Sequence, residues 1–99
     1  MAGVMIVETR CSSPDELASY HQWYDEVHIP EMLEVEGFRS ARRYAAADGE
    51  SFLAIYEIEV DLRTAMAALD AARASGTRST PVGVATDPPP VIRFFEALG

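Results

Sequence analysis

The stretch FRSARRYAAADGESFLAIYEIEV, residues 38–60, decides the fold that we expect for this chain. It contains two strand-like runs, residues 38–47 and residues 51–60, of which the second is rich in apolar and aromatic side chains. Asp48-Gly49 lies between the two runs, and this dipeptide favours the tight turn of a β-hairpin. The sequence therefore predicts that the two runs pair as antiparallel strands.

Upstream of this hairpin, the sequence predicts one strand and one helix. Residues 3–9, GVMIVET, are apolar and β-branched, which indicates a buried strand. Ser13 and Glu16 have the spacing of a capping box, and Pro14 suits the first helical position. We expect a helix that begins here and runs over residues 14–28.

The end of this first helix is expected at its histidine. Ile29 precedes Pro30, and the residue before a proline is disfavoured in helical backbone, so the helix should end or kink near His28. Proline suits the first turn of a further short helix over residues 30–35. Gly37 is then expected to end that piece.

Downstream of the hairpin, Asp61 is expected to cap a second helix over residues 62–75, where apolar side chains recur at helical spacing. Residues 77–90 include three consecutive prolines and indicate an irregular loop, and residues 91–98 resemble a final strand. The order β-α-β-β-α-β predicts an α+β fold of the ferredoxin-like type. Such a fold has a four-stranded antiparallel sheet with both helices on one face. We expect residues 1–99 to form a single domain.

The composition narrows the class of protein. Hydrophobic residues make up 48% of the 99 residues, which is typical of a globular domain. The net charge of −8 argues against nucleic acid as a partner. No apolar run approaches the roughly 20 residues of a membrane helix, so no membrane association is predicted. Cys11 is the only cysteine, and the N-terminus lacks the pattern of a signal peptide, so we expect a cytoplasmic protein.

The expected sheet has one face that its two helices leave uncovered. Six aromatic residues of the strands supply more apolar surface than two short helices cover: Phe38, Tyr44, Phe52, Tyr56, Phe94 and Phe95. Such a face is normally buried by another surface. Because two-fold dimers are the commonest oligomers, we expect a homodimer.

Residues 20–44, YHQWYDEVHIPEMLEVEGFRSARRY, followed by FLAIYEIE at residues 52–59, resemble the EthD-like family of the dimeric α+β barrel superfamily. The resemblance rests on the Trp- and Tyr-rich helix end, the HIP element at residues 28–30 and the strand that follows Gly37. It implies a homodimer in which two sheets close into a barrel, with a pocket between sheet and helices in each subunit. Members of this kind include polyketide cyclases and dehydratases, cofactor-free anthrone-type oxygenases and muconolactone isomerases. The implied ligand is a compact apolar or aromatic small molecule.

His28 and Tyr24 are the candidate catalytic residues. Imidazole exchanges protons near neutral pH, and the carbonyls at a helix C-terminus would favour its protonated form. The alternative interpretation is that His28 simply caps those carbonyls. A phenol beside it at Tyr24 can donate a hydrogen bond to a developing oxyanion. His21 is expected to be a surface residue.

Four further side chains are candidate substrate-binding residues: Trp23, Arg42, Tyr44 and Tyr56. Arg42 and Arg43 are adjacent on a strand, so one points to each face of the sheet. The semi-buried one needs an acidic partner, which Glu57 or Glu59 could provide; an arginine in this place could also anchor a carboxylate or phenolate. Tyr44 and Tyr56 are expected to face each other across the hairpin.

The function predicted from these residues is a small enzyme that transfers protons, by cyclisation, dehydration or isomerisation, on a polyketide-like or aromatic molecule. No cofactor motif and no metal site are recognised. Two alternatives stay open: a binding or accessory protein without chemistry, and a cofactor-free oxygenase of the anthrone type. Whether residues 77–90 form a lid is also left open.

Overall fold

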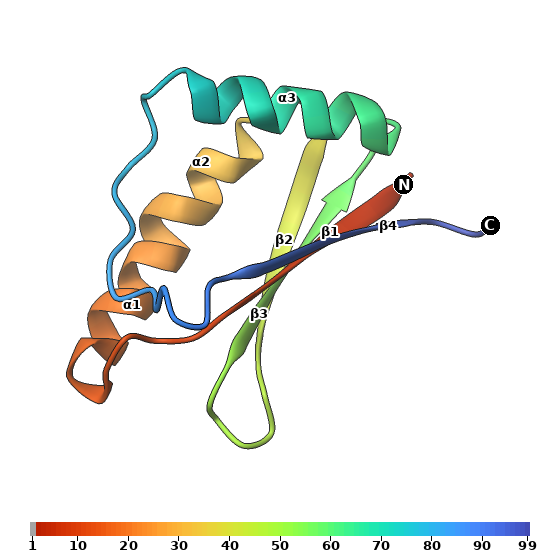
Figure 1. Cartoon of the computed structure of the whole chain (residues 1–99). Helices are drawn as coiled ribbons and strands as arrows, with labels where there is room; N and C mark the ends of the chain where they lie inside the picture. Colours follow the sequence, from red (N-terminus) through yellow and green to blue (C-terminus); the bar gives the residue numbers. More distant parts are fainter. Residues whose placement is uncertain (1) are drawn as a thin grey trace.

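The computed structural model describes residues 2–99, which form one antiparallel sheet and two helical parts (Figure 1). The sheet order is β2-β3-β1-β4. The strands are β1 (Gly3–Thr9), β2 (Phe38–Ala45), β3 (Phe52–Ile58) and β4 (Val91–Glu96). The helical elements are a 3-10 turn (Pro14–Glu16), α1 (Leu17–Trp23), a π-helical turn (Tyr24–His28), α2 (Ile29–Leu33) and α3 (Leu62–Ala74).

Both helical parts cover the same face of the sheet. In Figure 1 the α1–α2 stretch and α3 lie on one side of the four strands, and the other side carries no helix. This layering and the strand order confirm the predicted ferredoxin-like α+β fold. We call the two sides the covered face and the open face of the sheet.

The sequence predicted an end or a kink near His28: the first helical part does not end there, but a π-helical turn over Tyr24–His28 interrupts its α-helical geometry and α2 follows. The backbone of His28 and Ile29 is helical, and the helical part continues to Leu33. A π-helical turn precedes Pro30, and within it the Ile29 amide donates to the carbonyl of Tyr24, five residues back. The wider turn relieves the crowding that a proline ring causes in an α-helix, and the chain therefore passes Pro30 without a break.

The two predicted caps have different outcomes. Ser13 precedes the 3-10 turn, but its side chain makes no capping hydrogen bond, so the predicted capping box is wrong. The Ser12 hydroxyl instead donates to the carboxylate of Glu16. At α3 the prediction is confirmed, because Asp61 Oδ1 accepts from the Thr64 amide at 2.9 Å.

The hairpin forms as predicted, but one consequence drawn from it is wrong. β2 and β3 pair antiparallel around a turn in which Gly49 has a φ of +74°. This register places Tyr44 opposite Leu53 and Tyr56 opposite Ala41, so the two tyrosines do not face each other. Because side chains alternate along a strand, Tyr56 points to the covered face and Tyr44 to the open face.

The core lies between the covered face and the helices. Its largest fully buried side chains are Tyr20, Tyr56, Met5, Ile58 and Leu69. Complete burial of a large apolar side chain contributes about 1.5–3 kcal/mol each, so this layer supplies most of the stability of the chain. The Tyr20 hydroxyl is paired within this core with the hydroxyl of Thr9.

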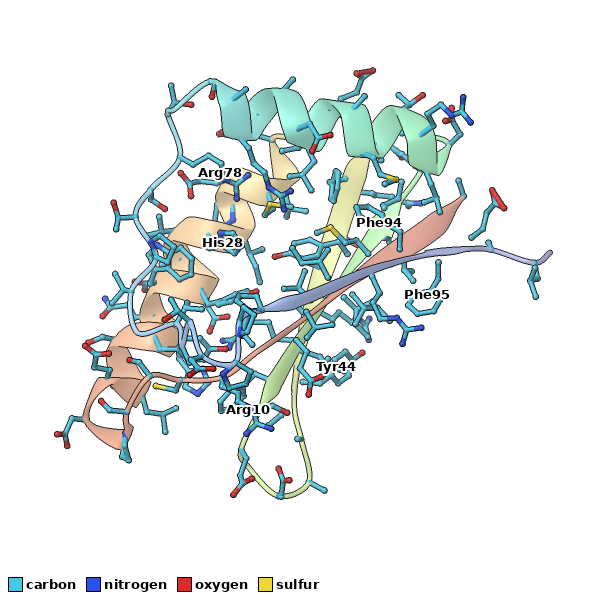
Figure 2. The ribbon with its side chains drawn as sticks, viewed as in Figure 1. Arg10, His28, Tyr44, Arg78, Phe94 and Phe95 are labelled. Carbon is cyan, nitrogen blue, oxygen red and sulfur yellow. The ribbon has the colours of Figure 1, made fainter. Side chains whose placement is uncertain are left out.

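The expectation of six aromatic residues on an uncovered face is only partly right. Four of them pack on or against the core of the covered face: Phe38, Phe52, Tyr56 and Phe94. Tyr44 and Phe95 belong to the open face and are 47% and 38% exposed. Figure 2 shows Phe94 and Phe95 on opposite sides of β4. The same face carries aliphatic and charged neighbours: Val4, Ile6, Leu53, Ile55 and Val91, and Glu8, Arg42, Glu57 and Arg93.

Candidate functional site

A cavity of about 210 Å³ opens on the covered face, between the sheet, the first helical part and residues 77–90. The sheet, the helices and the loop each supply part of its wall: Met5, Val7, Thr9, Trp23, Tyr24, His28, Met32, Arg73, Arg78, Pro81, Val84, Pro90 and Ile92. Three of the six predicted site residues, Trp23, Tyr24 and His28, are therefore brought together in one wall. Tyr24 and His28 are four residues apart in the π-helical turn, so their side chains lie on the same side of the helical part.

His28 is held between two aromatic rings. Its imidazole is stacked on the Trp23 indole, with 4.7 Å between centroids and 21° between planes. The ring of Tyr24 meets it edge-on, with 4.9 Å between centroids. Figure 2 shows His28 on the inner side of the helical part, facing the space that the strands and residues 77–90 enclose. These contacts fix the orientation of the imidazole toward the cavity.

Burial lowers the pKa of His28 to about 4, and the positive charges of Arg78 and Arg73 act in the same direction. The carboxylate of Glu31 opposes them, with a smaller effect than burial or Arg78. His28 is therefore a neutral imidazole at neutral pH, which can accept a proton. The predicted preference for the protonated form is wrong, because it depended on a helix end that His28 does not occupy.

Two buried phenols, those of Tyr24 and of Tyr56 in the adjoining core, are protonated at neutral pH. Burial raises the pKa of Tyr24 to about 12, and the neighbouring phenol of Tyr20 adds to the shift. Burial also raises the pKa of Tyr56, whose hydroxyl has no hydrogen-bond partner within residues 2–99. Tyr24 lines the cavity, whereas Tyr56 lies in the core beside it and is not part of the cavity wall.

Residues 77–90 form the outer wall of the cavity and are tied to the helix through Ser79. The Ser79 amide and hydroxyl donate to the two carboxylate oxygens of Glu31 at 2.9 and 2.7 Å. Trp23 Nε1 donates to the Ser79 hydroxyl at 3.2 Å. A second contact is an isolated antiparallel β-bridge, in which the backbone of Val84 pairs with the backbone of Cys11 just after β1. The irregular loop predicted from the prolines is therefore held against the helical part and β1 by hydrogen bonds, and it forms part of the cavity wall.

Arg43, not Arg42, is the semi-buried arginine of the pair. Its guanidinium lies 3.1 Å from Asp25 Oδ1 and 4.5 Å from the centre of the Tyr24 ring. The predicted partners, Glu57 and Glu59, are wrong because both lie away from the covered face; the Glu57 carboxylate instead accepts from Ser40. An ion pair with a cation–π contact explains this arginine as a support for Tyr24.

Arg42 and Tyr44 lie on the open face and do not line the cavity. His21 is half-buried, and its imidazole meets the Phe52 ring edge-on with 4.8 Å between centroids. His21 is also absent from the cavity wall, which contains His28 as its one histidine in the described part of the chain. The two imidazoles thus have separate surroundings, although one helical part carries both.

Sequence reasoning missed the two arginines of the cavity, Arg73 and Arg78. Arg73 is in the last turn of α3, and Arg78 follows in the loop after Gly76. Neither residue belongs to a motif, and their shared place depends on how residues 77–90 fold back over the helix. The available signal was two arginines flanking the end of a helix, which more often marks a solvated surface.

Two kinds of feature are absent from residues 2–99. No group of three or more His, Cys, Asp and Glu side chains is arranged to hold a metal ion. No helix has the length and the hydropathy needed to span a membrane.

Comparisons with known proteins show the fold. No family model matches the sequence, and no curated protein matches it. A monooxygenase from the gene ActVA-Orf6 of Streptomyces coelicolor, solved with the ligand nanaomycin D, is similar with a TM-score of 0.68 and 21% identity over 99% of this chain and 88% of that chain. Rv0793 from Mycobacterium tuberculosis is similar with a TM-score of 0.58 and 18% identity over 99% of this chain and 97% of that chain. At these identities the likeness extends to the fold alone, and the EthD-like family stays a prediction.

Proposed function

We propose that the cavity binds a compact aromatic or polyketide-like molecule and that His28 removes a proton from it. The observation that supports this most is a neutral imidazole and a protonated phenol on one apolar wall. The cavity of about 210 Å³ is smaller than the roughly 300–1,000 Å³ of drug-sized sites, which favours a ligand of one or two rings. Trp23 supplies a flat apolar surface for such rings.

The proposed reaction begins at a C–H bond next to a carbonyl group. His28 takes the proton, and the bonding electron pair moves to the carbonyl oxygen as an enolate. The Tyr24 hydroxyl donates to that oxygen, while Arg43 holds the Tyr24 ring in place. Return of the proton from His28 to another carbon completes an isomerisation. A hydroxyl on the β-carbon that leaves with that proton as water completes a dehydration, and attack of the enolate carbon on a second carbonyl carbon, whose oxygen takes the proton, completes a cyclisation.

The other three predicted substrate-binding residues, Tyr56, Arg42 and Tyr44, do not line the cavity. Tyr56 packs in the core beside Tyr24 and would act through it, since Tyr56 is outside the cavity wall. Arg42 could contact a ligand only on the open face, whereas Tyr44 also borders a small hollow beside His21 and Phe52.

A second candidate function is a cofactor-free oxygenase, in which the carbanion left by the proton transfer reacts with dioxygen. The fold-level likeness to a monooxygenase solved with nanaomycin D favours this candidate. Consumption of dioxygen together with the organic substrate would distinguish it from cyclisation, dehydration and isomerisation, which consume none. A binding or accessory protein is the third candidate and would show neither activity.

Proton transfer can be tested without the natural substrate. 2-Tetralone is a two-ring ketone whose acidic C–H groups exchange with D₂O, and NMR follows that exchange. We expect saturable acceleration by the protein, loss of the acceleration in His28→Gln, and a fall in rate below a pH of about 4 in the native protein. His21→Gln is the matched control and should exchange at the native rate. Equal rates for the native protein and His28→Gln would reject His28 as the base.

We also propose that the open face pairs with a second copy of the chain and that the protein acts in the cytoplasm. Tyr44, Phe95 and their aliphatic neighbours leave an apolar sheet surface exposed on the single chain. Native mass spectrometry of the purified protein tests the dimer. A mass equal to one chain at micromolar concentration would reject it. A bound small molecule released on denaturation would identify a natural ligand.

A further inference from the structure

We propose that the cavity selects an anionic aromatic ligand and that Arg78 binds its acidic group, an ionised carboxyl or an acidic enol or phenol. This inference rests on the proposed small-molecule site and specifies the charge of its ligand. It makes Arg78 a specificity-determining residue of a region where the sequence indicated only a loop.

Arg78 lacks the partner that a partly buried arginine normally has. All eight basic residues are arginines, and only Arg43 and Arg78 are not exposed. Arg43 has its carboxylate in Asp25, at 3.1 Å. Within residues 2–99, Arg78 has no carboxylate within 4.0 Å, and its Nη2 donates to the thioether sulfur of Met32 at 3.2 Å. A thioether is a weak acceptor, and a guanidinium has five donors in a planar fork, so most donors of Arg78 make no hydrogen bond within residues 2–99 and are open to a ligand or to water.

The charge of the cavity wall is opposite to the charge of the protein. The chain has a net charge of −8, yet the lining residues include two arginines and no Asp or Glu. The nearby carboxylate of Glu31 is occupied by two hydrogen bonds from Ser79. Asp70 lies 3.9 Å from Arg73 on the exposed side of α3. A positive wall inside an apolar cavity favours an anion, because the low local dielectric strengthens the attraction.

Arg78 is also placed to influence the chemistry at His28. Figure 2 shows the Arg78 side chain extending from the loop toward His28 in the space between α2, α3 and the strands. Its positive charge is one of the causes that lower the pKa of His28. An anion bound to Arg78 offsets that charge and makes the imidazole a stronger base when the ligand is present. The free protein would then hold a weak base that gains strength on binding.

The test compares two probes of nearly equal shape, 2-naphthoate and the neutral 2-naphthamide, by isothermal titration calorimetry at neutral pH. We expect the native protein to bind 2-naphthoate at least about tenfold more tightly than 2-naphthamide. Arg78→Gln should lower the affinity for the acid to that for the amide and leave amide binding unchanged. Arg63→Gln removes an equal charge from the exposed surface of α3 and is the matched control.

Each other outcome has a defined meaning. Equal binding of acid and amide to the native protein would overturn the anion preference but leave the small-molecule site standing. A preference for the acid that survives Arg78→Gln would overturn the assignment to Arg78. If neither probe binds the native protein, the proposed site and this inference are both overturned. If Arg78→Gln does not fold, Arg78→Lys replaces it, because lysine keeps the charge but lacks the planar fork of a guanidinium. This variant should show an intermediate preference for the acid. An unchanged preference would reject the forked contact.

Discussion

The covered face and the open face of the sheet are built from the same strands but have different roles. On the covered face, Tyr20 and Tyr56 are fully buried, and the polar groups His28 and Arg78 reach a cavity beside them. On the open face, Tyr44 and Phe95 are partly exposed next to aliphatic side chains. The comparison shows that one face carries the buried core and the candidate site of the single chain, while the other leaves apolar side chains partly exposed, where we propose that a second copy pairs.

The largest difference in the free energy of unfolding is expected between alanine substitutions of two tyrosines on adjacent strands. Tyr56→Ala should lower the free energy of unfolding by about 3–5 kcal/mol, because it empties a fully buried site. Tyr44→Ala on the open face should cost less than about 1 kcal/mol in urea denaturation at low protein concentration. Tyr56→Phe removes only the unpartnered hydroxyl and is the control, expected within about 1 kcal/mol of the native protein. Equal losses for both alanine variants would contradict the division between the faces.

The pH dependence of stability tests whether His28 is buried on the covered side of the sheet. The pKa of His28 is about 4 in the folded chain, whereas the ordinary pKa of a histidine is 6.5, so the unfolded state binds more protons between these values. Stability should therefore fall by about 3 kcal/mol as the pH drops from 6.5 to 4. Thermal denaturation over this range should show a shallower dependence for His28→Gln than for the native protein. His21→Gln should retain most of the native dependence.

Gly83 tests how the wall of the cavity is held in place. Its φ is +70°, and a Cβ built there would lie 2.9 Å from the Cβ of Tyr20. Gly83→Ala should therefore destabilise the protein by about 1–3 kcal/mol, with faster hydrogen exchange in residues 77–90. Gly49→Ala is the matched control, since Gly49 has a φ of +74° and no atom within 4 Å of its added Cβ. Similar exchange in both variants would show that the contact with Tyr20 contributes little.

The smallest effect on the stability of the single chain is expected on the open face. Phe95→Glu adds a charge to an exposed position and should change the unfolding free energy of the monomer by less than about 1 kcal/mol. The same change should convert the proposed dimer to monomer in native mass spectrometry, because a charge would be buried without a partner. A dimer that persists in this variant would place the interface elsewhere.

Several predictions from sequence were confirmed because they depended on local signals. Gly37 and Gly49 have positive φ angles where a helix end and a turn were expected. Asp61 caps α3 through the Thr64 amide. Trp23, Tyr24 and His28 lie in one wall of the cavity because neighbouring turns of one helical part present their side chains on one side, and their role in a site stays a prediction.

The errors concern residues whose surroundings come from distant parts of the chain. The helix continues through Pro30 because a π-helical turn accommodates the ring, and the residues before the proline carry no local signal that distinguishes this from a helix end. Arg43 pairs with Asp25 of the helix and not with the neighbouring strand, because the covered face is where the guanidinium points. Arg78 lines the cavity in a loop whose next residue, Ser79, donates to Glu31 of α2, a contact between segments far apart in the chain.

The sequence by itself determined the order β-α-β-β-α-β, the hairpin and the cap of the second helix at Asp61. These features follow from hydrophobic period, turn residues and caps, which act over a few residues. Only the tertiary structure decided which arginine of the adjacent pair is partly buried, that Arg73 and Arg78 line the cavity, and that residues 77–90 form its outer wall. Those properties depend on register and on contacts between segments far apart in the chain, where burial and neighbouring charges change what each side chain can do.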